Sequence, residues 1–255
     1  MTIEPHVLMA LVLIVAIGAF VNGMIGFGFA LLAVNALASV LGAKQGVVVM
    51  SLLTPTISGY QLWHNRRYLA TWARLRSLLL GAVAGSFVGA QLLVLLPGWA
   101  IALALGAFTA EFVVETMRRE RPPLALGTER RLAPIAGLVS GTTNGALGAS
   151  GPVVGSYLIA SGLRGREFAF GISLVFFIQG LMRGALFLTL GQYTIPLVIA
   201  AATLIVPSMV GQQVGLLFQG RLNAAMFQRV VLVVLLISSV NMLLSGAQGL
   251  MAAIS

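Results

Sequence analysis

The stretch NGALGASGP, residues 144–152, decides how this chain folds. It holds three glycines, a proline, an asparagine and a serine, all of which are weak helix formers. Apolar sequence flanks it on both sides, at residues 135–139 and 153–159. Backbone groups that leave a helix at membrane depth find partners only in surrounding protein or in a watery cavity. The stretch therefore predicts a helix break at a buried, functional place.

The composition is typical of a membrane protein. Of the 255 residues, 59% are hydrophobic and 8% are charged, whereas soluble domains are about one quarter charged. Apolar runs close to the roughly 20 residues of a membrane span recur at 78–96, 100–114, 168–190, 195–218 and 230–244. We therefore predict an all-α integral membrane protein that crosses the plasma (inner) membrane several times.

The residue types that are missing exclude several classes of site. Cysteine and aspartate are absent, and the histidines are His6 and His64 alone. We therefore expect no disulfide, no metal site of the usual His/Asp/Cys kind and no cofactor. The longest polar stretch, residues 118–131, leaves no room for a soluble catalytic domain. The net charge of +9 lies in separate loop clusters, so we do not expect a nucleic-acid partner.

The arginines predict the topology. Basic residues cluster at 66–76, 118–131, 164–166 and 221–229, and such loops stay cytoplasmic under the positive-inside rule. The connections at 97–99 and 191–193 and the C-terminal tail carry no positive charge, so we place them outside, together with the N-terminus. Segments 7–41 and 132–162 must then each begin and end on the same side of the membrane. We expect each to be two half-helices joined by a break, as a re-entrant hairpin, with paired full spans as the alternative.

The break has an earlier copy in the chain. NGMIGFG begins at Asn22 and NGALGAS at Asn144, an offset of 122 residues. The same offset, without a gap, pairs Ser51 with Ser173, Ser86 with Ser208 and Gln91 with Gln213. Equivalent loops carry opposite charge character, which predicts two repeats of inverted topology. We expect residues 1–117 and 132–255 to be the repeats, each with a broken helix pair and three transmembrane helices, joined by a cytoplasmic linker at 118–131. Inverted repeats with broken helices are typical of secondary transporters.

At these motifs the chain resembles a known family. The segments NGMIGFGFALLA (22–33) and NGALGASGPVVGSYL (144–158), followed by GLRGREF (162–168) and GISLVF (171–176), resemble the TauE/SafE sulfite exporter family. The resemblance spans essentially the whole chain, although GFGF at 26–29 stands where many relatives carry a run of glycines. It implies a permease for a small sulfur-containing anion, such as sulfite or an organosulfonate, working by alternating access. A passive anion channel and a carrier of a non-sulfur carboxylate are the alternatives.

The breaks supply most of the candidate substrate ligands. Half-helices that begin after a break present free N–H groups and a positive dipole end, which suit an anion. The candidates here are Asn22, Gly26, Gly28, Thr142, Thr143, Asn144, Gly148, Ser150 and Gly151. The alternative for the two asparagines is that they only cap the broken helices.

Further candidates lie in the flanking helices. Arg183 falls about two turns before the outer loop, and a membrane-buried arginine is costly and usually functional. Gln179 shares its face one turn away. The alternative for Arg183 is snorkelling to the outer surface. Gln91 and Gln213 are also candidates, with interhelical packing as the alternative.

Glu111 is the candidate group for a coupling proton or sodium ion. It lies one turn from Glu115, and the alternative for both is a salt bridge with Arg118 or Arg119. GASG at 148–151 also matches the nucleophile motif of rhomboid-type proteases, but no histidine follows residue 64 to act as the base. We therefore do not expect an enzyme. The sequence leaves open whether the chain forms a homodimer. Glycines recur every four residues at Gly81, Gly85 and Gly89 and at Gly211 and Gly215, and such glycine ladders fit helix contacts within one chain or between two.

Overall fold

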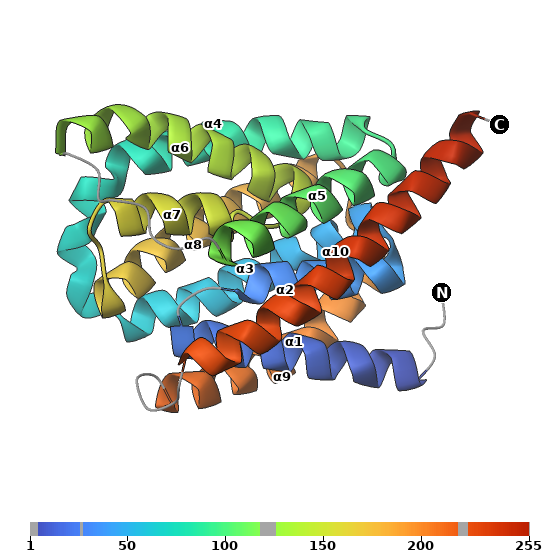
Figure 1. The fold of residues 1–255 in the computed structure, drawn as a ribbon, viewed down its shortest axis with the longest axis horizontal. Coiled ribbons are helices and arrows are strands. Elements are labelled where there is room, and N and C mark those ends of the chain that lie inside the picture. Colours follow the sequence, from blue (N-terminus) through green and yellow to red (C-terminus); the bar gives the residue numbers. More distant parts are fainter. Residues whose placement is uncertain (1–4, 26–27, 118–125, 219–223, 255) are drawn as a thin grey trace.

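The computed structural model describes residues 5–25, 28–117, 126–218 and 224–254, and all regular structure in these ranges is helical. The first half contains α1 (Pro5–Ile25), α2 (Phe29–Leu41), α3 (Ala43–His64), the 3-10 helix η1 (Arg66–Thr71), α4 (Trp72–Leu95) and α5 (Gly98–Met117). The second half contains α6 (Leu126–Leu147), α7 (Gly151–Ala160), α8 (Gly165–Thr189), α9 (Ile195–Leu217) and α10 (Ala224–Ile254), and Figure 1 shows them as one bundle.

Five helical stretches in the described residues are long and apolar enough to cross a membrane. They are Arg66–Leu95, Gly98–Met117, Gly165–Thr189, Ile195–Leu217 and Leu232–Ile254. Large apolar side chains on α9, such as Ile195, Ile199 and Val206, are exposed, as expected for surfaces that face lipid. The prediction of an all-α integral membrane protein is confirmed.

The helix boundaries recur at the same 122-residue offset as the sequence motifs. α1 ends at Ile25 and α6 at Leu147, and α2 begins at Phe29 where α7 begins at Gly151. α4 ends at residue 95 and α9 at residue 217. The duplicated sequence therefore builds locally similar structure in both halves. Opposite orientation of the two halves in the membrane stays a prediction.

The two segments expected to be paired half-helices have unequal arms. α1 has 21 residues and α6 has 22, so each is about 30 Å long, close to the thickness of the hydrocarbon layer. α2 and α7 have 13 and 10 residues. The first arms are therefore longer than half-helices, but neither is among the five stretches long and apolar enough to cross a membrane, so the re-entrant arrangement stays a prediction. α6 begins at Leu126, so the last residues of the predicted linker 118–131 are helical.

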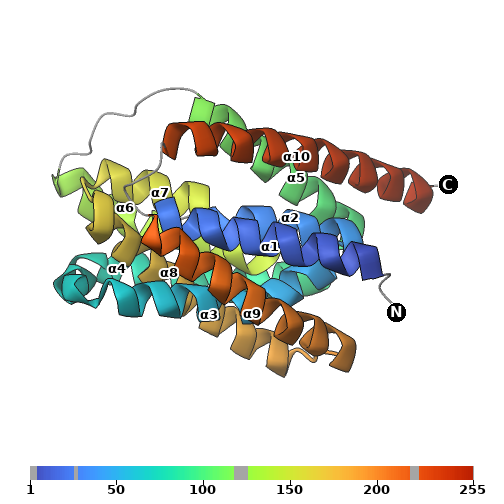
Figure 2. The same ribbon diagram turned by 90° about the horizontal axis from the view of Figure 1, so that it is seen from below.

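The two halves pack together through helix pairs in which each half contributes one helix. α4 of the first half packs along α6 of the second, and α9 packs along α1. Glycines allow the first contact, because a Cβ at Gly85 would lie 2.1 Å from the Leu138 carbonyl oxygen and one at Gly141 would lie 2.1 Å from that of Ala82. This glycine ladder is therefore used within one chain. Figure 2 shows α10 lying along α5, which completes the contact between the halves.

Candidate functional site

The backbone breaks are built on glycines in left-handed conformations. Gly28 has a φ of 110° and Gly148 a φ of 76°, a region that favours glycine. Gly28 and Ser150 are the N-cap residues of α2 and α7, and neither makes a side-chain capping bond. The alternative that Asn22 and Asn144 cap these helices is therefore wrong. Gly151 opens α7 and is buried, whereas Gly26 lies outside the described residues.

Arg183 is hydrogen-bonded to the second break. Its Nη1 donates to the backbone oxygen of Asn144 at 2.7 Å and to the Oδ1 of Asn144 at 2.9 Å. Its Nη2 donates to the Oγ1 of Thr54, on α3, at 3.2 Å. The side chain is 0% exposed, so the alternative of snorkelling to the surface is wrong. Sequence reasoning missed Thr54, which lies in the other half of the chain.

A chain of buried hydrogen bonds extends from Asn144 across the break. Asn144 Nδ2 donates to the hydroxyl of Ser150 at 3.3 Å, and this hydroxyl donates to Gln179 Oε1 at 2.8 Å. Gln179 Nε2 in turn donates to the hydroxyl of Ser140 at 3.0 Å. Ser150 therefore donates to an amide oxygen and not to a base, so nothing in this arrangement activates it as a nucleophile. We call Asn144, Ser150, Gln179, Arg183 and Thr54 the cationic cluster.

The first break carries a neutral counterpart. Asn22 Nδ2 donates to Gln61 Oε1 at 2.7 Å and to Gln212 Oε1 at 3.0 Å, and all three side chains are buried. Gln61 follows Asn22 by 39 residues, the same separation that joins Arg183 to Asn144. We call Asn22, Gln61 and Gln212 the neutral cluster. The repeat thus preserves the contact and replaces the charged side chain by an amide.

Two predicted glutamines are not part of either cluster. Gln213 is exposed, and its neighbour Gln212 occupies the buried face of α9 instead. Gln91 is partly buried and makes no hydrogen bond to another described residue. Thr142 is not part of either cluster. Its hydroxyl donates to the Leu138 backbone oxygen, and its own backbone packs against the glycines of α4.

Each cluster contains a buried N–H donor that has no partner in the described part of the chain. These donors are the Nε of Arg183 and the Nε2 of Gln212. An unsatisfied buried donor costs about 1–3 kcal/mol, and more where the group is charged. Among the described residues, no carboxylate pairs with Arg183. Both clusters therefore suit a hydrogen-bond acceptor, and the cationic cluster suits an anion.

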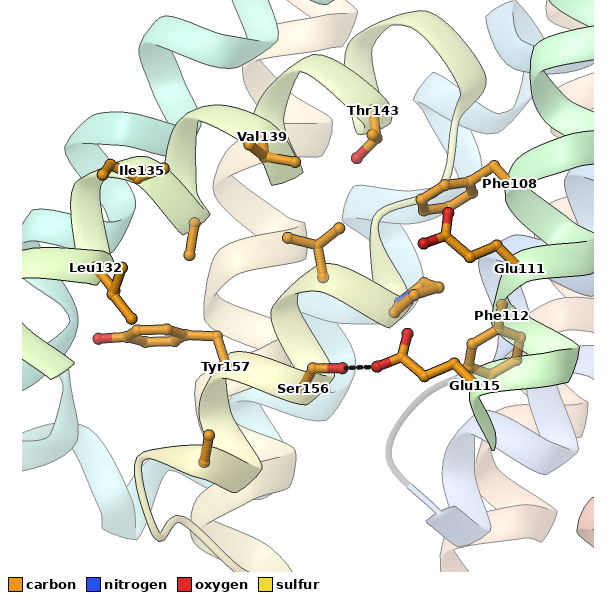
Figure 3. A pocket seen from close by; sticks show the side chains of 14 residues that line it. Phe108, Glu111, Phe112, Glu115, Leu132, Ile135, Val139, Thr143, Ser156 and Tyr157 are labelled. Carbon is orange, nitrogen blue, oxygen red and sulfur yellow. Dashed lines mark hydrogen bonds between the residues drawn. The ribbon is translucent and has the colours of Figure 1, made fainter. Parts of the chain in front are cut away.

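A cavity of about 710 Å³ lies between α5, α6 and α7, and Figure 3 shows its lining. It extends along α6 from Leu132 to Thr143, and Thr143 directly precedes Asn144 of the cationic cluster. Pro152, two residues after Ser150, also lines it. The cavity therefore ends beside the second break. The hydroxyl of Thr143 itself donates to the Ser140 backbone oxygen at 3.0 Å.

Two carboxylates from α5 face this cavity (Figure 3). Glu111 is exposed within it, and Glu115 accepts a hydrogen bond from Ser156 of α7 at 3.1 Å. The alternative partners, Arg118 and Arg119, lie outside the described residues. Nowhere in the described ranges, this cavity included, do three histidine or carboxylate side chains gather in a way that would hold a metal ion.

The cavity marks a difference between the two halves. α10 packs along α2. α5, the counterpart of α10, meets α7, the counterpart of α2, chiefly through the Ser156–Glu115 bond, and the cavity separates the rest of the two helices. The contact is therefore closed between α10 and α2 and open between the equivalent helices α5 and α7.

Comparison with known proteins agrees with the resemblance of the two motifs. A family model described as sulfite exporter TauE/SafE matches residues 10–242. Neither the curated proteins nor the solved structures contain a match to this chain. The family match includes both breaks, both clusters and the cavity. The chain therefore belongs to the sulfite exporter TauE/SafE family of membrane transporters.

Proposed function

We propose that this chain is a secondary transporter of a small sulfur-containing anion, such as sulfite or an organosulfonate. The observation that carries the proposal is Arg183, a fully buried cation held against the second break with its Nε unpaired. Buried charges are costly unless they are paired. A sulfonate or sulfite oxygen accepts a charge-assisted hydrogen bond from a guanidinium, which makes such an anion a suitable partner.

The cavity supports a route from one side of the membrane to this arginine. At one end it is lined by Leu132, which follows directly in the sequence on an arginine-rich segment that the positive-inside rule assigns to the cytoplasm. On the opposite side, the Tyr193 hydroxyl contacts that of Ser51 at 2.5 Å. Tyr193 belongs to the connection after α8 and lies over Gly184, next to Arg183. This arrangement fits a state that is open to the cytoplasm and closed outside.

The difference between the two halves supports a mechanism of alternating access. In the second state, α5 closes onto α7 while α10 separates from α2, so that the two halves exchange their arrangements. Inverted repeats make such an exchange energetically accessible, because each half has the sequence pattern of the other and each already adopts one of the two arrangements. Glu111, exposed in the cavity, is the proposed group for a coupling proton, since a neutral carboxyl lets an anion pass where a carboxylate repels it.

Counterflow in proteoliposomes tests this function. Vesicles loaded with unlabelled sulfite take up labelled sulfite faster than empty vesicles if the protein is a carrier, because the loaded carrier returns faster. A passive channel shows no acceleration, and a carboxylate carrier shows it with small carboxylates but not with sulfite or organosulfonates. Arg183→Gln should abolish the acceleration. Arg76→Gln, at an exposed arginine of α4, is the matched control and should keep it.

A further inference from the structure

A second pocket lies at the C-terminal end of α3, next to Gln61 of the neutral cluster and six or more residues beyond Thr54 of the cationic cluster. Its volume is about 490 Å³, and its lining includes Arg66 and Arg67 of η1 and Arg166 of α8. None of the described residues that line it carries a carboxylate. The nearest acidic neighbour in sequence, Glu167, is engaged by the hydroxyl of Thr71 at 3.0 Å. The pocket is therefore a concentrated positive surface.

The arginines of this pocket differ in how they are held. Arg66 stacks over the ring of Trp63, with 4.6 Å from its guanidinium carbon to the ring centre, and donates to the Trp63 backbone oxygen at 3.2 Å. Arg67 and Arg166 are exposed and make no hydrogen bond or ion pair within the described part of the chain. Their guanidinium groups are therefore available to a phosphate, which arginine recognises through paired donors.

Asn65 gives the pocket a second kind of contact. It lines the pocket and is 2% exposed, and its Nδ2 donates to the Gln61 backbone oxygen at 3.0 Å. Its Oδ1 has no partner among the described residues. A ligand hydroxyl that reaches this oxygen would satisfy it. The pocket thus combines donors for a phosphate with one acceptor for a hydroxyl group.

The position of the pocket indicates where such a ligand comes from. Trp63 is 67% exposed beside it, at the end of a helix, and exposed tryptophans mark the membrane–water interface. Basic pockets at this level of a membrane protein attract anionic lipid headgroups. We propose that this pocket binds the headgroup of an anionic phospholipid that carries free hydroxyls, of the phosphatidylglycerol type.

A bound headgroup would act on the first break, an effect that rests on the proposed transport function. Asn65 holds the Gln61 backbone, and the Gln61 side chain accepts the hydrogen bond from Asn22 of the neutral cluster. A lipid that orders the last turn of α3 therefore also orders Gln61. Transport should be faster in vesicles that contain the anionic lipid than in vesicles of phosphatidylcholine alone.

The binding test uses the whole purified chain and needs no transport. Native mass spectrometry and thermal unfolding are measured with phosphatidylglycerol, phosphatidylcholine, inorganic phosphate and glycerol 1-phosphate. We expect phosphatidylglycerol to bind and stabilise selectively. Arg166→Gln and Arg67→Gln should each weaken this binding about tenfold, as loss of one charge-assisted bond predicts. Arg76→Gln removes the same charge from an exposed helix position and should leave the binding unchanged.

Three results would overturn the proposal. Equal stabilisation by phosphatidylcholine, or equal weakening by Arg76→Gln, would show general attraction to the membrane instead of a site. Equally strong binding of the two soluble phosphates would assign the pocket to a soluble ligand. Selective binding without any change in counterflow rate would remove the regulatory effect. If wild-type protein shows no sulfite counterflow in either lipid, the proposed function fails while the binding result still decides the pocket.

Discussion

Replacing Arg183 by glutamine gives the cationic cluster the side chain that the neutral cluster already has. Gln61 reaches Asn22 at 2.7 Å across 39 residues, and Arg183 reaches Asn144 across the same separation at 2.9 Å. A glutamine at position 183 is therefore compatible with the local geometry. The substitution removes a positive charge from the cluster without leaving a cavity as large as alanine would. It separates the role of the charge from the role of the contact.

The structure predicts a small effect on stability and a large effect on anion binding. Glutamine loses the three charge-assisted bonds of Arg183 to Asn144 and Thr54, each of which contributes about 1.5–3 kcal/mol. A neutral hydrogen bond with Asn144, like that between Gln61 and Asn22, is expected to remain. Removing the buried ion offsets the loss of the charge-assisted bonds, because its desolvation costs several kcal/mol. The ligand-free Tm should therefore change by only a few degrees. Losing one charge-assisted bond to the anion should weaken binding roughly tenfold to a hundredfold.

Thermal unfolding in detergent measures both quantities. At a sulfite concentration one hundred times the wild-type Kd, the ligand stabilises the protein by about 2.7 kcal/mol. A variant with tenfold to hundredfold weaker binding is stabilised by about 1.4 to 0.4 kcal/mol at the same concentration. Arg76→Gln should keep the full shift. Arg74 is unsuitable as a control, because its guanidinium makes a bidentate ion pair with Glu129 at 2.9 and 2.8 Å.

One combination of results would refute the reasoning. If Arg183→Gln lowers the ligand-free Tm strongly and keeps the full sulfite shift, Arg183 is a structural cross-link between α6, α8 and α3. The anion would then bind elsewhere. The reciprocal change, Gln61→Arg, adds a charge to the neutral cluster. It should lower the ligand-free Tm, because Gln61 already donates to the Asn22 backbone oxygen, at 3.4 Å, and no hydroxyl of a described residue bonds to Gln61 as Thr54 does to Arg183.

Three further predictions test the packing, the topology and the coupling. Gly85→Ala places a Cβ 2.1 Å from a carbonyl oxygen of α6 and should cost about 1–3 kcal/mol of stability, whereas a Cβ at Gly98 meets nothing within 4 Å and Gly98→Ala should be neutral in the same melts. Cysteine placed at Arg67 should resist an impermeant thiol reagent in intact cells, and cysteine at Gln192 should react; the reverse pattern would invalidate the inverted repeat. Glu111→Gln should retain counterflow and lose accumulation driven by a pH gradient, and a variant that still accumulates sulfite would exclude Glu111 as the coupling group.

The helix breaks could be predicted from the sequence because their cause is local. Glycine, serine and proline end a helix wherever they occur together, and α1 and α6 each end three residues after the asparagine. The duplication could also be predicted, since a constant offset needs no structural knowledge. The length of the first arm could not, because α6 continues back to Leu126 through a polar segment that hydropathy assigns to a loop.

The site was predicted only in part because side-chain partners depend on helix rotation. The repeat offset pairs Gln91 with Gln213, but neither joins a cluster. Gln212 shares a buried face with Ser208 and Gly215, which are four and three residues away. This helical spacing of small and polar residues was the signal in the sequence that could have identified Gln212 as the buried glutamine. The contact of Arg183 with Thr54 and the cavity between α5 and α7 depend on the packing of segments far apart in the chain, for which no local pattern exists.

The spacing of the two clusters limits how an anion can use them. Thr54, which contacts Arg183, and Gln61, which contacts Asn22, both belong to α3. Seven residues separate them, which is about 10 Å along a helix. Sulfite is much smaller than this distance, so a single sulfite ion meets one cluster at a time. Its charge favours the cationic cluster, and the neutral cluster offers amide donors without holding the ion electrostatically. A longer organosulfonate with a second polar end can contact both clusters at once. Tighter binding of such an organosulfonate than of sulfite would indicate that the two clusters act jointly, and equal binding would indicate that they act in sequence.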